Sequence, residues 1–133
     1  YTLSGGQVLP RQTGHDMPTS TLYGVFRARD GDLVIAAQVD DAWLRFAALL
    51  EQQGGPTGFG SDARFHSLNG RNAHREEILA AVKAWVSPRA VADVLALLDG
   101  IDVPSAKVQR IDEVIHDPQI RARGMLLDNS TVV

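Results

Sequence analysis

Gly14 to Ala37 reads GHDMPTSTLYGVFRARDGDLVIAA, and this stretch decides the fold. It holds two apolar runs, residues 22–28 and 33–37, on either side of an Asp-Gly pair. Asp-Gly between apolar runs is typical of a β-hairpin, because the turn needs a positive φ that Gly31 adopts without a Cβ clash. We therefore predict a hairpin over about residues 22–37.

A loop rich in Pro, Thr and Ser precedes the hairpin, at residues 13–21. Irregular segments that a rigid element holds in place often carry ligand contacts. This loop is therefore the first place to look for function, and His15 is the histidine within it.

The composition is that of one globular domain. The chain has 133 residues, 44% of them hydrophobic and 22% charged, which is enough to bury a core. The net charge of −3, with both signs mixed, gives no electrostatic reason to expect nucleic acid or an acidic membrane as a partner. Cysteine is absent, so neither a disulfide nor a thiolate metal site can form.

No apolar run approaches membrane-spanning length and no signal peptide is visible, so we expect a cytoplasmic protein. The chain begins with Tyr1 and ends on the run 131–133, Thr-Val-Val. Both ends look cut, and we expect the chain to be a piece of a longer protein.

Three main helices are predicted after the hairpin. The first covers about residues 41–53, with Asp40 or Asp41 as its cap, and the second covers about 72–86, with Asn72 available as a cap. The third begins at Ser87-Pro88, with Ser as the cap and Pro in the first helical position. Apolar residues at helical spacing give each helix one face to bury. These faces are Trp43, Phe46, Ala47 and Leu50; Ile78, Val82, Trp85 and Val86; and Val91, Val94, Leu95 and Leu98.

Shorter elements complete the chain. They are a helical turn at 61–65 within the loop 54–70, a strand within 101–108, brief helices at 111–115 and 117–122, and a strand at 125–127 paired with residues from 131 onward. The sum is an α+β domain. Its small antiparallel sheet consists of the hairpin at about 22–37 and short C-terminal strands, packed with the three main helices.

The residue types indicate no complete active site. The four histidines, His15, His66, His74 and His116, lack the spacing of a metal site. No serine lies in a nucleophile elbow, and the Gly-rich residues 54–60 lack the Lys-Ser/Thr of a phosphate loop.

Charged and aromatic residues have structural interpretations that compete with function. Asp30 and Asp32 are best explained as turn formers, and the tryptophans lie at core spacing. Four arginines could contact a phosphate, although scattered arginines at helix ends usually form a solvated face. They are Arg71, Arg75, Arg121 and Arg123.

Several short segments nevertheless form an ordered set. They are Gly14-x-x-x-Pro18, Tyr23 to Ala36, Trp43, Asp62 to Phe65, Arg71, Val103 to Val108, and Asp117 to Met125. Their order and spacing, over about residues 10–128, resemble the small domain of the class III CoA-transferases, the CaiB/BaiF family. This family includes formyl-CoA and carnitine CoA-transferases and α-methylacyl-CoA racemases.

The resemblance implies that this domain packs against a larger Rossmann-like domain and that two full-length chains interlock as a homodimer. Residues 1–12 would be a connector and residues 13–133 the small domain. The family's catalytic Asp, which forms an acyl anhydride and then a CoA thioester, belongs to the large domain, as do most CoA contacts. No catalytic residue is therefore assigned in this chain, and its CoA-binding residues stay unknown.

The family feature that maps onto this chain is the loop at 13–23, which closes over the acyl end of the thioester. The resemblance assigns Gly14, His15, Met17 and Tyr23 to this substrate loop. In formyl-CoA transferase the loop is rich in glycine, whereas residues 14–18 contain one Gly here. This departure argues against oxalate- or formate-like substrates, and Met17 and Leu22 suit a more apolar acyl group.

The function implied is transfer of CoA between an acyl-CoA and a carboxylic acid, with the CoA thioester as substrate and no metal. The isolated chain would be inactive, because the catalytic Asp lies outside it. Two alternatives stay open: an acyl-CoA racemase of the same family, and a non-catalytic dimerisation or scaffold module.

Overall fold

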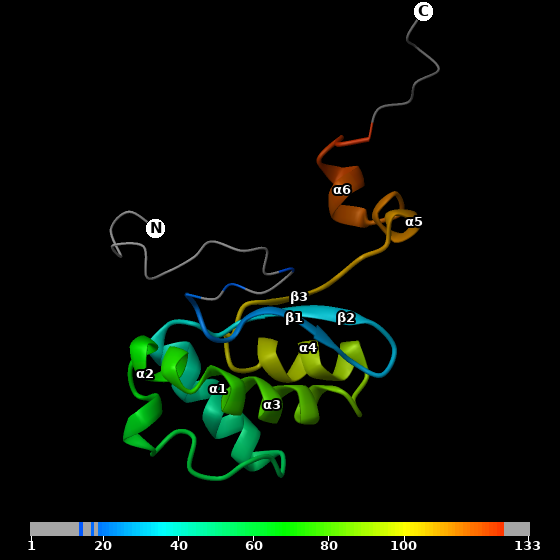
Figure 1. Ribbon diagram of the computed structural model, residues 1–133. Helices are drawn as coiled ribbons and strands as arrows, with labels where there is room; N and C mark the ends of the chain where they lie inside the picture. Colours follow the sequence, from blue (N-terminus) through cyan, green and yellow to red (C-terminus); the bar gives the residue numbers. More distant parts are fainter. Residues whose placement is uncertain (1–13, 15–16, 18, 127–133) are drawn as a thin grey trace, which may run out of the picture.

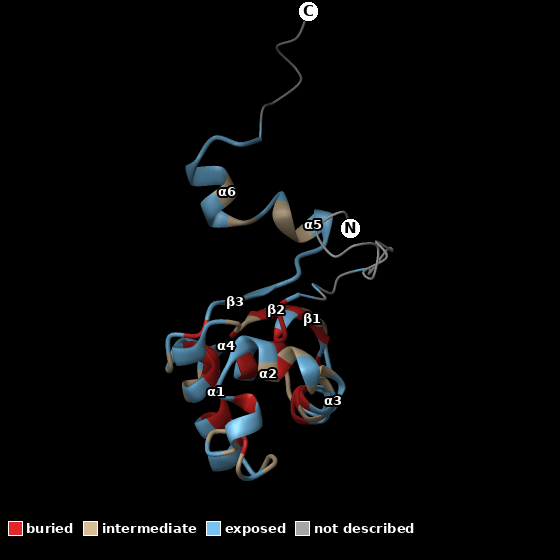
Figure 2. Ribbon diagram, turned by 60° about the vertical axis from the view of Figure 1, so that its left-hand side comes forward, coloured by how far each residue is buried: buried red, intermediate tan, exposed pale blue. Residues whose placement is uncertain are grey.

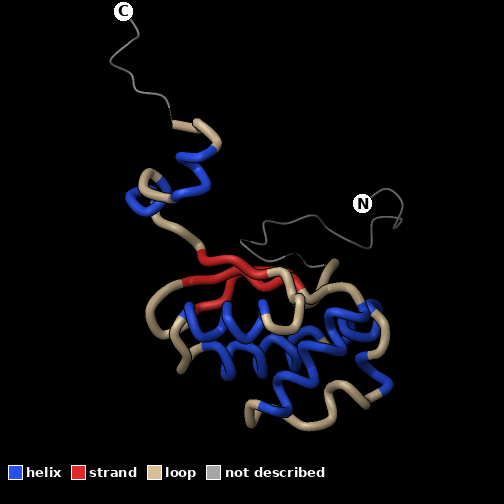
Figure 3. Tube along the Cα trace, turned by 180° about the vertical axis from the view of Figure 1, so that it is seen from behind, coloured by secondary structure: helices blue, strands red, loops and turns tan. Residues whose placement is uncertain are grey.

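The computed structural model describes Gly14, Met17 and residues 19–126. In Figure 1 a small sheet lies over a layer of helices, and the last two short helices stand away from both. Figure 3 shows the same layers from behind. A three-stranded antiparallel sheet with helices against it confirms the predicted α+β class.

The elements follow one another with short connections. They are β1 (Tyr23–Arg27), β2 (Asp32–Ala36), α1 (Asp40–Gln52), the 3-10 turn η2 (Ala63–Phe65), α2 (Leu68–Ala73), α3 (Arg75–Val86), α4 (Val91–Asp99), β3 (Ser105–Lys107), α5 (Ile111–Val114) and α6 (Pro118–Ala122). The three long helices are α1, α3 and α4, which confirms the three main helices predicted from the sequence.

The sheet has the strand order β1-β2-β3, and both pairs are antiparallel. Phe26, Leu33 and Ile35 alternate with their neighbours and are buried on the face that the helices cover. Side chains alternate between the two faces of a strand, so Val25 and Val34, which pair with each other, lie on the opposite face.

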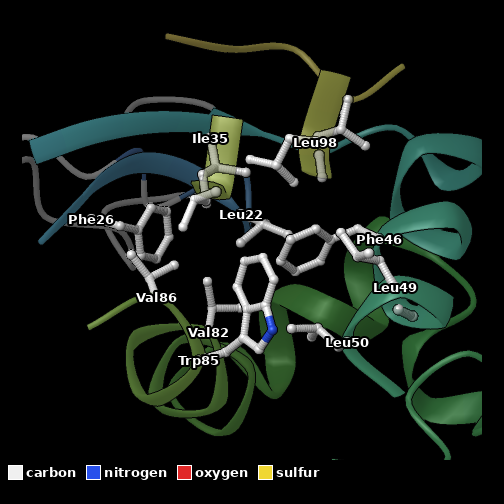
Figure 4. Close-up of a cluster of buried hydrophobic side chains, with 14 of the residues drawn as sticks. Leu22, Phe26, Ile35, Phe46, Leu49, Leu50, Val82, Trp85, Val86 and Leu98 are labelled. Carbon is white, nitrogen blue, oxygen red and sulfur yellow. The ribbon is translucent and has the colours of Figure 1, made fainter. Parts of the chain in front are cut away.

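The core lies between the sheet and the helices, and Figure 4 shows its centre. Phe46 of α1 and Trp85 of α3 meet edge to face, with their ring centroids 5.9 Å apart. Trp43 stacks on the ring of Phe59, with centroids 6.1 Å apart, and meets the ring of Phe65 edge to face at 6.2 Å. Burial of these aromatic rings adds to the apolar area that holds the layers together.

The hairpin is present, but its turn differs from the prediction. Arg27 pairs with Asp32, and the amide of Ala28 donates to the carbonyl of Gly31 at 2.8 Å, so four residues form the loop. Gly31 does not adopt a positive φ. A Cβ on Gly31 would lie 3.3 Å from Cγ2 of Val91, so the glycine serves the close approach of α4 rather than the turn dihedral.

Two predicted helix starts are wrong, and a long-range contact explains the second. The second helix is divided at His74, whose φ of −113° and ψ of 27° end α2 before α3 begins. Ser87 closes α3 and does not start α4. The amide of Val91, at the start of α4, donates instead to the carboxylate of Asp30 in the hairpin turn, at 2.8 Å.

Smaller differences concern the start of α1 and the last described residues of the chain. The cap of α1 is Val39, and Asp40 lies inside the helix, where its carboxylate is used elsewhere. The predicted strand at 125–127 is wrong for Met125 and Leu126, which are exposed and not in a strand. Residue 127 and its predicted partners from 131 onward lie outside the described residues.

Candidate functional site

The candidate site is the loop that leads into β1, and its last residues are buried. Ser20, Thr21 and Leu22 are 6%, 0% and 0% exposed. Leu22 has a φ of 64°, a conformation that a residue with a branched side chain adopts only when its surroundings hold it there. Its carbonyl accepts a hydrogen bond from the amide of Ala37 at 2.9 Å, so the loop joins the sheet at a defined point.

Asn72 of α2 holds the loop at Thr21. Its Oδ1 accepts from the backbone amide of Thr21 at 2.8 Å and from the hydroxyl of Thr21 at 2.7 Å. Its Nδ2 donates to the carbonyl of Thr19 at 2.9 Å. One amide side chain thus pairs with three polar groups of the loop, two of which belong to a fully buried residue.

Two further side chains, Gln38 and Arg75, hold the loop at residues that precede Thr21. The hydroxyl of Ser20 donates to Oε1 of Gln38 at 2.6 Å. Arg75, at the start of α3, donates from Nη1 to the carbonyl of Met17 at 3.2 Å and to that of Ser20 at 3.4 Å. The base of the loop is therefore attached to β2–α1, to α2 and to α3.

Arg71 fixes the helix that carries Asn72. Its side chain is completely buried, and its Nη atoms donate to the carbonyls of Phe65 and Gln38, each at 2.9 Å. It also forms an ion pair of 2.6 Å with Asp40 and stands 5.6 Å from the ring centroid of Trp43. The prediction that Arg71 belongs to a solvated face is therefore wrong, because the chain turns inward here to satisfy buried carbonyls.

The predicted substrate-loop residues have different surroundings. Gly14 is exposed and has a φ of 65°, a conformation that favours glycine. Met17 is 43% exposed, while its carbonyl is held by the amide of Ser20 and by Arg75. His15 lies outside the described residues.

Tyr23 is 39% exposed and pairs with Ala36 in the sheet register, on the face away from the helices. No hydrogen bond or ring contact among the described residues links Gly14, Met17 and Tyr23 to one another. Hydrogen bonds thus hold the backbone at Met17 and at residues 19–21, while the side chains of Met17 and Tyr23 are open to solvent.

The chemistry of this arrangement is that of binding and enclosure. In the described part of the chain, no group of three or more His, Asp or Glu side chains is placed to hold a metal ion. A hollow of about 280 Å³ lies on another part of the surface, among Gln53 to Pro56, Ala81, Trp85 and Arg89. None of the described residues of the loop lines that hollow.

The carboxyl groups whose pKa is lowered also lie away from the loop. The side chain of Arg64 donates to Asp62 and lowers the pKa of that carboxyl. Lys107 does the same to the pKa of Glu113, and the side-chain amide of Gln109 lowers the pKa of Asp117. Each carboxylate stays ionised and serves a local contact, so none has the raised pKa of a general acid.

Sequence reasoning missed the two residues that anchor the loop, Asn72 and Arg75. Asn72 was expected to cap a helix and Arg75 to face solvent. Their partners lie more than 50 positions earlier in the chain, at Thr21 and Met17, so no local pattern relates them. The run Thr19-Ser20-Thr21 before an apolar strand was the available signal, because buried hydroxyls and amides need partners.

The fold and the anchored loop can now be compared with known proteins. Residues 1–132 match the family model of CoA-transferase family III, and the chain belongs to this family. The crystal structure of a CaiB/BaiF family protein from Brucella suis is 27% identical, with a TM-score of 0.75 over 98% of this chain and 34% of that one.

Curated relatives of this chain are class III CoA-transferases. The succinyl-CoA:mesaconate CoA-transferase of Haloarcula marismortui is 34% identical over 119 residues, which are 90% of this chain and 28% of that enzyme. The succinate–glutarate CoA-transferase of Agrobacterium fabrum is 27% identical over 128 residues, 96% of this chain and 30% of that enzyme. The chain therefore spans less than a third of the length of these relatives.

No helix among the described residues combines the length and the apolar composition that crossing a membrane requires.

Proposed function

We propose that this chain is the small domain of a class III CoA-transferase that moves CoA between an acyl-CoA and a carboxylic acid. Residues 13–133 form the domain and residues 1–12 its connector. The catalytic Asp belongs to a larger domain outside this chain, and two full-length chains form an interlocked homodimer in the cytoplasm. The family match over residues 1–132 is the observation that carries the proposal.

The role proposed for the loop at 13–23 is to close over the acyl end of the thioester. A base that is held by hydrogen bonds, together with the exposed side chains of Met17 and Tyr23, suits a segment that must cover a substrate and exclude water. Gly14, His15, Met17 and Tyr23 are the residues that would face the acyl group.

Dicarboxylic acids are the first substrates to test. Succinyl-CoA, mesaconate, succinate and glutarate appear in the names of the relatives compared above. The exposed Met17 favours a more apolar acyl group, so unsubstituted fatty acids of similar length belong in the same assay.

The test is CoA transfer by the intact natural protein, with succinyl-CoA as donor and each acid in turn as acceptor. New acyl-CoA is measured by liquid chromatography and mass spectrometry. Transfer to at least one acid supports the proposal, and the 133-residue chain alone should show none. An intact protein that transfers CoA to no acid, with any acyl-CoA donor offered, contradicts it.

The loop is tested by Met17→Ala in the intact protein, with Leu44→Ala as control, since the two side chains are 43% and 46% exposed. We expect Met17→Ala to change the ratio of kcat/KM between acids and Leu44→Ala to leave it unchanged. If His15→Ala and Met17→Ala both left turnover and acid preference as they were, the loop assignment would be wrong.

The two alternatives give different results. A racemase of this family would exchange the α-proton of a 2-methylacyl-CoA with deuterium from solvent and would transfer no CoA. A non-catalytic module would do neither, and this chain would associate with itself at moderate concentration in light scattering.

A further inference from the structure

Resting on the proposed function, we propose that Asn72 is a positioning residue of the enzyme: its side-chain amide sets the substrate loop so that the loop excludes water from the acyl thioester. Asn72 itself need not touch the substrate. It acts through Thr21 and Thr19, the residues that its three hydrogen bonds reach.

The first step of the argument is the geometry of Asn72. Thr21 is fully buried, and both its amide and its hydroxyl donate to the same Oδ1, at 2.8 and 2.7 Å. Buried polar groups that lose their partner are costly, so the position of Thr21 depends on this oxygen. Nδ2 then holds the carbonyl of Thr19, so one side chain fixes the residues on both sides of Ser20.

The second step is that α2 itself cannot shift easily. A Cβ on Gly70 would stand 2.1 Å from the carbonyl oxygen of Arg64, so the helix approaches η2 as closely as a glycine allows. The next residue, Arg71, is buried with two backbone carbonyls and Asp40 as partners. A positioning residue needs such a rigid support, because a displacement of about 1 Å can cost about 100-fold in rate.

The third step is the strain at Leu22. Its φ of 64° is maintained although its side chain is apolar and branched. The contacts of Asn72 with Thr21, directly before Leu22, and the bond from Ala37 to the carbonyl of Leu22 hold this conformation from both sides. Without Asn72, the strained residue loses the restraint at Thr21, and Gln38 and Arg75, which contact Ser20 and the carbonyl of Met17, are left to position the loop.

The chemical consequence concerns a competing reaction. In transfer, the bond between the donor acyl carbon and sulfur breaks, and the thiolate of CoA forms a new thioester with the acyl carbon of the acceptor acid. One carboxylate oxygen leaves the acceptor and ends, by way of the enzyme carboxylate, on the released donor acid. In hydrolysis, the oxygen of water bonds to the acyl carbon, the carbon–sulfur bond breaks, and a proton from water goes to the thiolate of CoA. A loop that closes correctly suppresses hydrolysis, so the ratio of hydrolysis to transfer reports its position.

The experiment compares Asn72→Ala with Asn69→Ala in the intact protein. Asn69 lies on the same helix and is exposed, and its side chain forms no hydrogen bond with the described part of the chain, so it is the matched control. With succinyl-CoA and the best acceptor acid, Asn72→Ala should lower the kcat of transfer about 10- to 100-fold and raise the ratio of hydrolysis to transfer. Asn69→Ala should change neither.

A second pair of variants tests the hydrogen bond between Thr21 and Asn72 from the loop side, by changing the residue that carries the hydroxyl. Thr21→Val is close in shape and loses the hydroxyl, while Thr21→Ser keeps it. Thr21→Val should raise the ratio of hydrolysis to transfer, and Thr21→Ser should restore it towards the wild-type value. Thermal unfolding of all four variants separates this effect from a general loss of stability, which would reduce both reactions together.

Hydrogen exchange gives a reading that does not depend on activity. The amides of residues 19–22 should exchange faster in Asn72→Ala than in the wild type. In Asn69→Ala their exchange rates should be unchanged. Unchanged exchange in Asn72→Ala, or an unchanged ratio of hydrolysis to transfer, overturns the positioning role. A wild-type protein that transfers no CoA contradicts the proposed function instead, so the two failures are distinguishable.

Discussion

The body of the molecule, residues 19–108, and the arm, residues 109–126, contain helices that are stabilised in different ways. Figure 2 shows buried residues throughout the helices and sheet of the body and none in α5 and α6. The long helices of the body bury one face against the sheet, whereas Ile111 and Met125 of the arm are 79% and 62% exposed.

The arm is formed by contacts between residues that are close in sequence. At the start of α5 the carboxylate of Glu113 accepts from the amide of Arg110 at 2.9 Å, and Asp117 caps α6 through the amides of Gln119 and Ile120. The body relies on contacts between residues far apart, such as Asp30 with Val91. Hydrogen bonds between neighbouring residues are therefore enough to start a short helix, whereas the long helices depend on burying an apolar face in the core.

The largest expected difference comes from removing one apolar side chain in each part. Phe46→Ala takes a fully buried ring from the core and should lower the free energy of unfolding by about 3–5 kcal/mol. Ile111→Ala should change it by no more than about 0.5 kcal/mol, because the side chain is exposed. Urea denaturation of the 133-residue chain measures both, and similar losses would mean that the arm has a burial partner in solution.

A polar side chain of the body should have the next largest effect. Arg71→Met leaves the carbonyls of Phe65 and Gln38 without their donors and should lower the free energy of unfolding by about 2–4 kcal/mol. Arg71→Lys keeps the charge without the fork of donors and should fall between Met and the wild type. Equal stability of all three proteins would contradict the buried geometry of Arg71.

Helix caps allow the most direct comparison. Asp30→Ala removes a cap that the hairpin supplies to α4, and the whole body should lose about 1 kcal/mol of stability. Asp117→Ala removes a cap within the arm, so α6 should lose helicity while the midpoint of global unfolding stays the same. Amide chemical shifts of α6 and a denaturation curve distinguish these outcomes, and Asp30→Asn, which keeps a side-chain oxygen, should behave nearly as the wild type.

The smallest effect is the response of the arm to acid. Hydrogen bonds from the side chain of Gln109 and from the amides of Ile120 and Gln119 lower the pKa of Asp117. A carboxyl with a lowered folded pKa stabilises the structure above its unfolded pKa and loses that contribution as the pH falls through the folded value. The helix α6 should therefore persist down to the ordinary Asp range and unfold below it.

An NMR titration of the Asp117 carboxyl and the Gln119 amide tests this expectation. In Gln109→Ala the pKa of Asp117 should rise, because the largest of its stabilising hydrogen bonds is absent. If the pKa of Asp117 were the same in Gln109→Ala as in the wild type, the hydrogen bond between Gln109 and Asp117 would not form in solution.

The sequence was sufficient wherever one stretch of chain contains both a feature and its cause. The apolar faces of α1 and α3, the hairpin pairing and the Asp117-Pro118 start of α6 all follow from periodicity or capping within a few residues. The ordered motifs from Gly14 to Met125 were likewise enough to indicate the family.

The tertiary structure decided the features that join distant segments. A glycine is needed at position 31 because α4 packs closely against it, and not because of the turn dihedral. The amide of Val91 donates to Asp30, and Asn72 forms hydrogen bonds with Thr21 instead of capping a helix. Each of these contacts forms between groups that folding brings together from distant parts of the chain. Spacing along the chain determines secondary structure, but the partner of a buried hydrogen bond is set by the packing of the layers.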